Sequence, residues 1–211
     1  MLGRTHFFIG TAAALAVLQP QTVPALVAGA GAAAIGGLIS DIDVGTSQAH
    51  RDADKIITAT VAVAVLTILA EYKLNLGIYR RLTSDNSVLR LLTGTAAFLL
   101  ICAYGKQQPH RSFMHSFAAL ALLTACVDII YPDASAYFAV GFLSHLVLDF
   151  FNRKPEKLFW PWKGFCLGFC SARGLVNRAL LGCGMVSLAV VLVLSAPAGR
   201  LMAKIMRAIY G

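Results

Sequence analysis

The chain has 211 residues, 58% of them hydrophobic and only 13% charged, and its mean hydropathy is +0.72. This composition excludes an ordinary soluble domain and indicates an integral membrane protein. The formal net charge is +8, but the Lys and Arg residues are spread over the polar connections, without a long basic run or interleaved aromatic residues. That distribution favours contact with a membrane surface and argues against a nucleic-acid partner.

Apolar runs predict an all-α bundle of about six to seven helices embedded in a membrane. In chain order, the expected helices cover residues 7–18, 25–39, 56–70, 89–104, 113–131, 134–151 and 180–194. The first two are short against the roughly 20 residues of a full span, so they are expected to form a partly immersed hairpin or to pack inside the bundle. Gly29, Gly31, Gly36 and Gly37 in the second helix would let another helix approach closely.

The last segment, 196–211, is predicted to be an amphipathic helix in the membrane interface, outside a membrane-embedded domain that covers residues 1–195. Three basic residues recur along this segment at helical spacing: Arg200, Lys204 and Arg207. Trp160 and Trp162, in a basic stretch before the seventh helix, also suit a bilayer interface.

The densest polar cluster is the stretch HRSFMHS at residues 110–116, which lies between two apolar runs. It carries His110, Arg111 and His115, and Ser112 is a natural N-cap for the helix that follows. Imidazole and guanidinium groups are costly inside an apolar layer. A cluster of this density at such a junction therefore points to a specific role.

Five further polar groups lie at or near helix ends: His6, Asp41, Asp43, His145 and Asp149. Asp41 and Asp43 are two residues apart after an apolar helix, a spacing that suits cation binding. His145 and Asp149 are four residues apart, so they share one face of the sixth helix. The first helix begins just after His6, and Thr5 can cap it.

The order of the helices predicts that these groups meet at one face of the membrane. If each helix crosses and returns, the same side receives seven side chains: His6, Asp41, Asp43, His110, His115, His145 and Asp149. Imidazole and carboxylate together are ligands for divalent metals, zinc first, with manganese or magnesium as alternatives. We therefore expect a site for one or two ions. The same count places 11 of the 18 Lys and Arg residues on the motif side, which assigns that face to the cytoplasm.

This ligand set predicts hydrolysis of a phosphoester, belonging to a lipid or a lipid-linked substrate. Zinc with an open coordination position lowers the pKa of a bound water to about 7, and two ions about 4 Å apart can clamp a phosphoryl group. Arg111 is placed to hold a phosphate bidentately. Asp43 or Asp41, whichever is not a ligand, could act as the general base.

Simpler interpretations exist for each residue alone. His145 and Asp149 could be an internal ion pair, and Arg111 could be a positive-inside anchor. Cys166 and Cys170, spaced CxxxC, could hold a metal, although no second Cys pair follows. His50 is expected to be solvated. The alternative function is a non-catalytic membrane protein with a structural metal, or an ion transporter. A transporter would place its polar groups near mid-membrane, whereas these cluster at helix ends.

Taken in order, the motifs resemble those of the YdjM family of bacterial inner-membrane, metal-dependent hydrolases. The matching elements are His6, SDID at 40–43, HRxxxHS at 110–116 and GxxSHxxxD at 141–149, within about residues 3–165. That family is distantly similar to zinc-dependent phospholipase C, which is all-helical. The resemblance implies an inner-membrane location, a phospholipase C-like site and metal ligands at His6, Asp41, His110 or His115, His145 and Asp149. Phospholipase C also uses a late glutamate as a ligand. After Asp149 this chain has Glu156 as its only acidic residue, which favours one or two ions over three.

Overall fold

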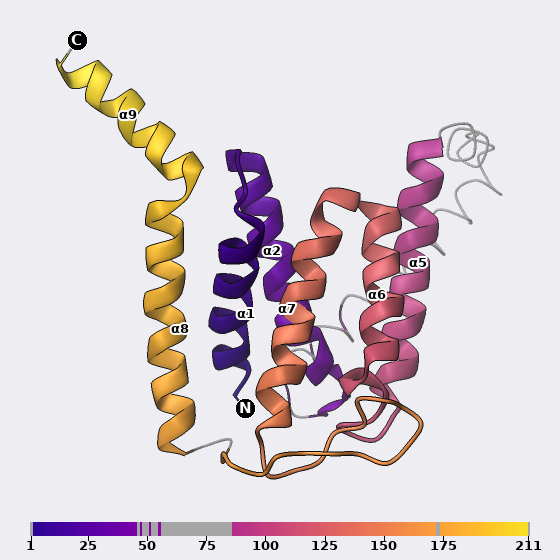
Figure 1. Ribbon diagram of the computed structural model, residues 1–211. Coiled ribbons are helices and arrows are strands. Elements are labelled where there is room, and N and C mark those ends of the chain that lie inside the picture. Colours follow the sequence, from indigo (N-terminus) through magenta and orange to yellow (C-terminus); the bar gives the residue numbers. More distant parts are fainter. Residues whose placement is uncertain are drawn as a thin grey trace.

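The computed structural model describes residues 2–45, 47, 51, 55, 86–171 and 174–210. Within these residues the secondary structure is helical, apart from two isolated bridges between residues 152 and 170 (Figure 1). Seven α-helices are described: α1 (Gly3–Leu18), α2 (Val23–Ile39), α5 (Asn86–Lys106), α6 (Phe117–Ile130), α7 (Pro132–Phe150), α8 (Leu175–Leu194) and α9 (Ala196–Tyr210). Two 3₁₀ helices are η1 (Ser40–Asp43) and η2 (Phe113–His115). The predicted all-α fold is confirmed. The predicted helix at 56–70 and His50 lie outside the described residues.

Helix α7 is the centre of the bundle. It packs against α1, α2 and α6, while α5 packs on α6 and α8 packs on α1. Phe138 and Phe142 of α7 are buried in one apolar core together with Leu123 of α6 and Ile42 of η1. A second cluster, around Leu15, joins α1, α2 and α7. The two clusters fix α7 on both sides, so residues near its C-terminal end are held by three neighbouring helices.

Within the described residues, three segments are long and apolar enough to span a membrane: Val23–Asp43, Ser87–Lys106 and Leu175–Leu194. The expectation that the second helix is too short is wrong. It begins earlier because the Thr22 side chain accepts a hydrogen bond from the backbone N–H of Ala25 at 3.2 Å, and η1 extends it. Helices α1 and α6 are shorter apolar helices. Large aliphatic side chains such as Leu100 and Val193 are exposed on the spans, as expected for lipid-facing surfaces.

Two expected helix starts are wrong. Helix α1 begins at Gly3 without a side-chain cap, so His6 lies in its first turn, and the Thr5 hydroxyl instead donates to Asn177 Oδ1 at 3.0 Å. Ser112 does not cap α6. Ser116 does, because residues 113–115 form the separate turn η2, and the Ser116 side chain accepts from the Ala119 backbone N–H at 3.1 Å. Helix α6 therefore begins at Phe117, four residues after the predicted start at residue 113.

Glycine allows α2 and α7 to approach at backbone contact. A Cβ added to Gly36 would collide with the carbonyl oxygen of Phe138, and one added to Gly141 would collide with that of Ala33. The close approach predicted for Gly36 is therefore confirmed. It is wrong for Gly31, because a Cβ there would meet nothing within 4 Å.

This contrast gives a test within one helix. Gly36→Ala should destabilise the protein by about 1–3 kcal/mol, because the added methyl forces α2 from α7. Gly31→Ala, the matched control, should be neutral or slightly stabilising, because alanine has the higher helix propensity. Thermal unfolding of the detergent-purified variants, followed by size-exclusion chromatography after heating, measures both. Equal melting temperatures would contradict the close packing of α2 on α7.

Candidate metal centre

All seven predicted groups come together at one end of the bundle, where α1 starts and α7 ends (Figure 1). Each has a contact with another member of the set. His6 Nε2 lies 3.3 Å from Asp149 Oδ1, His110 Nδ1 lies 2.9 Å from Asp43 Oδ1, His115 Nδ1 lies 3.4 Å from Asp43 Oδ2, and His145 Nε2 lies 3.8 Å from Asp41 Oδ1. The predicted convergence of helix ends is thus confirmed for the described residues.

The innermost pair of the site is formed by His115 and His145, both wholly buried. The Nδ1 of His145 lies 2.8 Å from the carbonyl oxygen of Gly37. A carbonyl only accepts, so Nδ1 carries the proton and Nε2 keeps a lone pair. This Nε2 faces the Nε2 of His115 at 3.3 Å. A proton on His115 or a metal ion must lie on this axis, because two bare lone pairs would repel.

The donor spacing fits zinc. Two ligand atoms bound tetrahedrally at 2.0–2.1 Å from one ion stand about 3.3 Å apart. The His115–His145 Nε2 pair has that separation, and so does the pair of His6 Nε2 and Asp149 Oδ1. Both ring nitrogens of His6 are buried without a hydrogen-bond partner in the described structure. Buried polar atoms normally find partners, so the ring nitrogens of His6 are suited to bind a cation.

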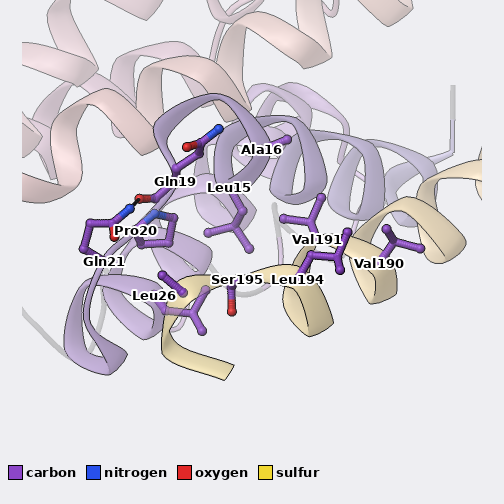
Figure 2. Close-up of a pocket in the computed structure, with 11 residues that line it drawn as sticks. Leu15, Ala16, Gln19, Pro20, Gln21, Leu26, Val190, Val191, Leu194 and Ser195 are labelled. Atoms are coloured by element: carbon purple, nitrogen blue, oxygen red, sulfur yellow. Dashed lines mark hydrogen bonds between the residues drawn. The ribbon is translucent and has the colours of Figure 1, made fainter. Parts of the chain in front are cut away.

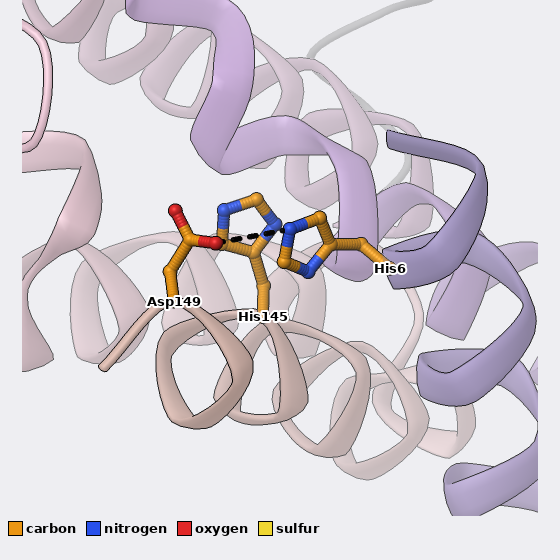
Figure 3. Close-up of side chains that lie close together, drawn as sticks. All are labelled: His6, His145 and Asp149. Carbon is orange, nitrogen blue, oxygen red and sulfur yellow. Dashed lines mark ion pairs between the residues drawn. The ribbon is translucent and has the colours of Figure 1, made fainter. Parts of the chain in front are cut away.

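Among the residues that the structure describes, three groups of side chains have ligand atoms within 4.8 Å of one another. They are His6, His145 and Asp149 (Figure 3); Asp41, His115 and His145; and Asp43, His110 and His115. The first two groups share His145, whose Nδ1 is already occupied by Gly37, so its single free nitrogen can bind one ion. Figure 3 shows the His6 ring alongside that of His145, and the two rings stack at 3.8 Å between centroids. The arrangement suits one buried ion, with room for one more at the rim beside His110.

Arg111 organises the carboxylates around this centre. Its guanidinium donates to Asp149 Oδ2 and to the Lys154 carbonyl, and its backbone N–H donates to Asp43 Oδ2 at 3.1 Å. Arg111 has φ of 63°, a left-handed conformation that is strained for this residue type and directs its N–H at Asp43. Asn152 Nδ2 donates to the other oxygen of Asp149 at 2.8 Å. Asp149 is therefore held in place before any metal binds.

The charges of the site favour a divalent cation. Three aspartates, Asp41, Asp43 and Asp149, meet one buried cation, Arg111, so with neutral imidazoles these four residues carry a net charge of −2. Uncompensated charge is costly where water is excluded. One divalent ion would neutralise it. Access is from the rim, where the His110 side chain is 39% exposed and that of Asp41 is 19% exposed.

Sequence reasoning missed the part played by Glu156. Its side chain is wholly buried, and neither carboxylate oxygen has a hydrogen-bond partner in the described structure. Two backbone hydrogen bonds with Phe165, at 2.9 and 3.0 Å, hold it there. Burial, with a further contribution from the charge of nearby Asp149, raises the pKa of Glu156 to about 8, and the charge of Arg111 opposes both effects. The available signal was its isolation, as the sole acid in a basic stretch.

An apolar cavity lies elsewhere. It has a volume of about 420 Å³ and is enclosed by the C-terminal ends of α1 and α8 and the start of α2, at the opposite end of the bundle (Figure 2). Its lining is mostly apolar, with residues such as Leu15, Leu26 and Val191, and contains no titratable side chain. The cavity therefore lacks the groups that hydrolysis requires, whereas the metal centre has them.

The neutral Glu156 predicts a specific pH dependence of stability in chelator-treated protein. Its pKa in the folded state exceeds the usual value, so it contributes stability at low pH that is lost as the pH rises toward about 8. Melting temperature should fall by several degrees between about pH 5 and pH 8.5, and Glu156→Gln should remove much of that fall. Asp133→Asn, which removes an exposed carboxyl, should leave the fall intact. An unchanged pH profile in Glu156→Gln would show that the carboxyl is ionised.

Comparison with protein families finds one match. The sequence profile of the family described as YdjM inner membrane protein matches residues 1–208. No curated protein matches the chain, and no solved structure does. The match covers every element that contributes to the metal centre, from His6 to Asp149. The chain belongs to the YdjM inner membrane protein family.

Proposed function

We propose that this protein is a membrane-embedded, metal-dependent hydrolase that cleaves a phosphoester of a lipid or lipid-linked substrate. The opposed Nε2 atoms of His115 and His145, with three aspartates around them, carry the proposal. Such a donor set is expensive to bury without a cation. It lies at one end of an apolar bundle, where a substrate from the membrane could reach the exposed rim. The assignment of residues 1–195 to one hydrolase domain is part of this proposal.

The buried ion would be held by residues of two groups that overlap at His145. Together these groups comprise His6, Asp41, His115, His145 and Asp149. His110 and Asp43 would provide the second, outer position together with His115. A divalent metal bound here, zinc by its donor set and spacing, would supply a Lewis acid and an activated water. Gly37, through its carbonyl, fixes the tautomer of His145 that metal binding requires.

Arg111 would bind the phosphate and orient Asp149. Part of its guanidinium is committed to Asp149 and Lys154, but its buried Nε has no partner in the described structure. Free N–H groups on a fixed guanidinium suit a phosphate oxygen, and a guanidinium cannot lose its proton at neutral pH. The same side chain would therefore stabilise the charge that develops on the phosphoryl oxygens.

The two candidate bases differ in their surroundings. Both oxygens of Asp43 already face donors, since Oδ1 meets His110 and Oδ2 meets the Arg111 backbone N–H. Asp41 is half-buried at the rim, and its Oδ1 lies 3.8 Å from Nε2 of His145. We assign Asp43 to orienting His110 and His115 and, when the outer ion position is empty, to base catalysis. If Asp43 binds an ion there, Asp41 is the base and the other four residues hold the buried ion.

A structural metal is the second candidate function. The burial of His6, His115 and His145 favours it, because structural sites are closed and fully ligated. A structural ion would stabilise the fold without supporting turnover. The exposed His110 at the rim favours a site that is open to a substrate instead.

The first test is metal content. Protein purified in detergent and loaded with zinc should retain about one tightly bound ion per chain, or about two if the rim position fills. His145→Ala should lower the affinity of the buried ion at least about tenfold, since it removes a shared ligand. His110→Ala is the matched control and should keep the buried ion. Elemental analysis after gel filtration measures occupancy, and unfolding curves show that the variants remain folded. Absence of metal from the wild type would leave the cluster as an ion-pair network and overturn the proposal.

The second test separates catalysis from structure. The zinc-loaded wild type should hydrolyse phosphoester probes, such as bis-p-nitrophenyl phosphate or a fluorescent phosphatidylglycerol, and Arg111→Lys should reduce the rate about a hundredfold while retaining the ion. Arg178→Lys, at an exposed position on α8, is the control. Bound metal with no hydrolysis of any probe would favour the structural role.

A further inference from the structure

The loop between α7 and α8 has an unusual surface. We define the platform as its described part, residues 151–171, which runs beneath the ends of α5, α6 and α7 (Figure 1). Large apolar side chains on it are exposed rather than buried: Phe151, Phe159, Trp162, Phe165, Leu167 and Phe169. Trp162 is 71% exposed and Phe169 is 73% exposed. Side chains alternate along an extended strand, and here Phe165, Leu167 and Phe169 all lie on the exposed side.

The platform is also basic. Arg153, Lys154 and Lys163 are exposed, and Lys157 is half-buried. Its one acidic residue, Glu156, points inward and is wholly buried. The outer surface thus combines aromatic rings with cations and offers no anion. Aromatic side chains favour the membrane interface, and each Lys or Arg near an anionic leaflet contributes about 1 kcal/mol of attraction.

Hydrogen bonds and a ring contact hold the platform against the helices. Leu167 donates its backbone N–H to the Phe150 carbonyl at 2.9 Å, and Phe117 donates to the Leu158 carbonyl at 2.9 Å. The Trp160 ring packs edge-on against Phe113 at 5.4 Å between centroids. The two tryptophans therefore differ. Trp160 is partly buried and packs on the edge of the core, whereas Trp162 is exposed.

The backbone of the platform also forms hydrogen bonds with Arg111 of the metal centre. The Lys154 carbonyl accepts from the Arg111 guanidinium, and the Lys157 N–H donates to the Arg111 carbonyl at 3.0 Å. Arg111 in turn holds Asp149. A surface that contacts lipid headgroups would therefore lie within a few residues of the phosphate-binding arginine.

We infer that the platform is seated on the anionic phospholipid headgroups of the leaflet next to the metal centre. Charge complementarity and the outward aromatic face select this partner over a water-facing surface. If the proposed function holds, the phosphate that reaches Arg111 belongs to a lipid of that leaflet and enters from the side. A soluble phosphoester would have no use for this apolar surface.

Two tryptophans give a direct test, because the chain has no others. In Trp160→Phe, all tryptophan fluorescence comes from Trp162, and in Trp162→Phe it comes from Trp160. The full-length variants are reconstituted into vesicles in which only one lipid, phosphatidylglycerol or phosphatidylcholine, is brominated near the headgroup. At equal mole fraction, brominated phosphatidylglycerol should quench Trp162 about twice as strongly as brominated phosphatidylcholine. Trp160 should be quenched several times less by both.

Arg153→Gln combined with Lys163→Gln should abolish the preference for the anionic lipid and leave quenching by the neutral lipid. Equal quenching of Trp162 by the two lipids in the wild-type background would overturn the anionic-lipid contact. Quenching by aqueous iodide but by neither lipid would overturn the inference altogether and point to water or a protein partner. If Trp160→Phe fails to fold, fluorotryptophan is incorporated into the wild type. Its two fluorine NMR resonances, assigned with Trp162→Phe, then report the lipid contact of each ring separately.

This experiment needs no bound metal. Zinc binding without lipid contact would contradict only the inferred seating of the platform on lipid. Lipid contact without zinc binding would contradict only the proposed hydrolase function.

Discussion

The arrangement of the metal centre depends on one constraint: the buried Nε2 atoms of His115 and His145 face each other at 3.3 Å. Their partners are fixed from several directions. Gly37 sets the tautomer of His145, Asp43 faces the far side of His115, and Arg111 braces Asp149. These contacts join the consecutive elements α2 and η1 to η2 and α7, which lie far from them in the sequence. Any cation that binds there completes interactions that the backbone has already arranged.

Much of this could be predicted from the sequence, because the relevant signals are local. Apolar runs predicted the helices, and the four-residue spacing of His145 and Asp149 placed two candidate ligands on one helix face. Counting helices placed His6 near Asp149 although 143 positions separate them, and the structure has them 3.3 Å apart. Such a count works because a membrane restricts each helix to one of two directions.

Other features escaped because they depend on contacts between distant parts of the chain. Ser112 looks as good a cap as Ser116, and only the turn that brings His115 to Asp43 decides between them. Gly31 and Gly36 are equivalent in sequence, yet only Gly36 meets the backbone of α7. Glu156 reads as an ordinary charge in a basic loop. Its burial follows from backbone pairing with Phe165, which no periodicity reveals.

The backbone contact at Gly36 and Gly141 also bears on how an ion would enter and leave. With α2 and α7 locked against each other beside the centre, the inner ligands cannot spread apart without breaking the core around Phe138 and Phe142. Exchange must then pass the rim, where the His110 ring can swing on its own bonds. An ion held by such a rigid wall and a hinged outer ligand would dissociate slowly, at a rate set by one side chain and not by the stability of the bundle.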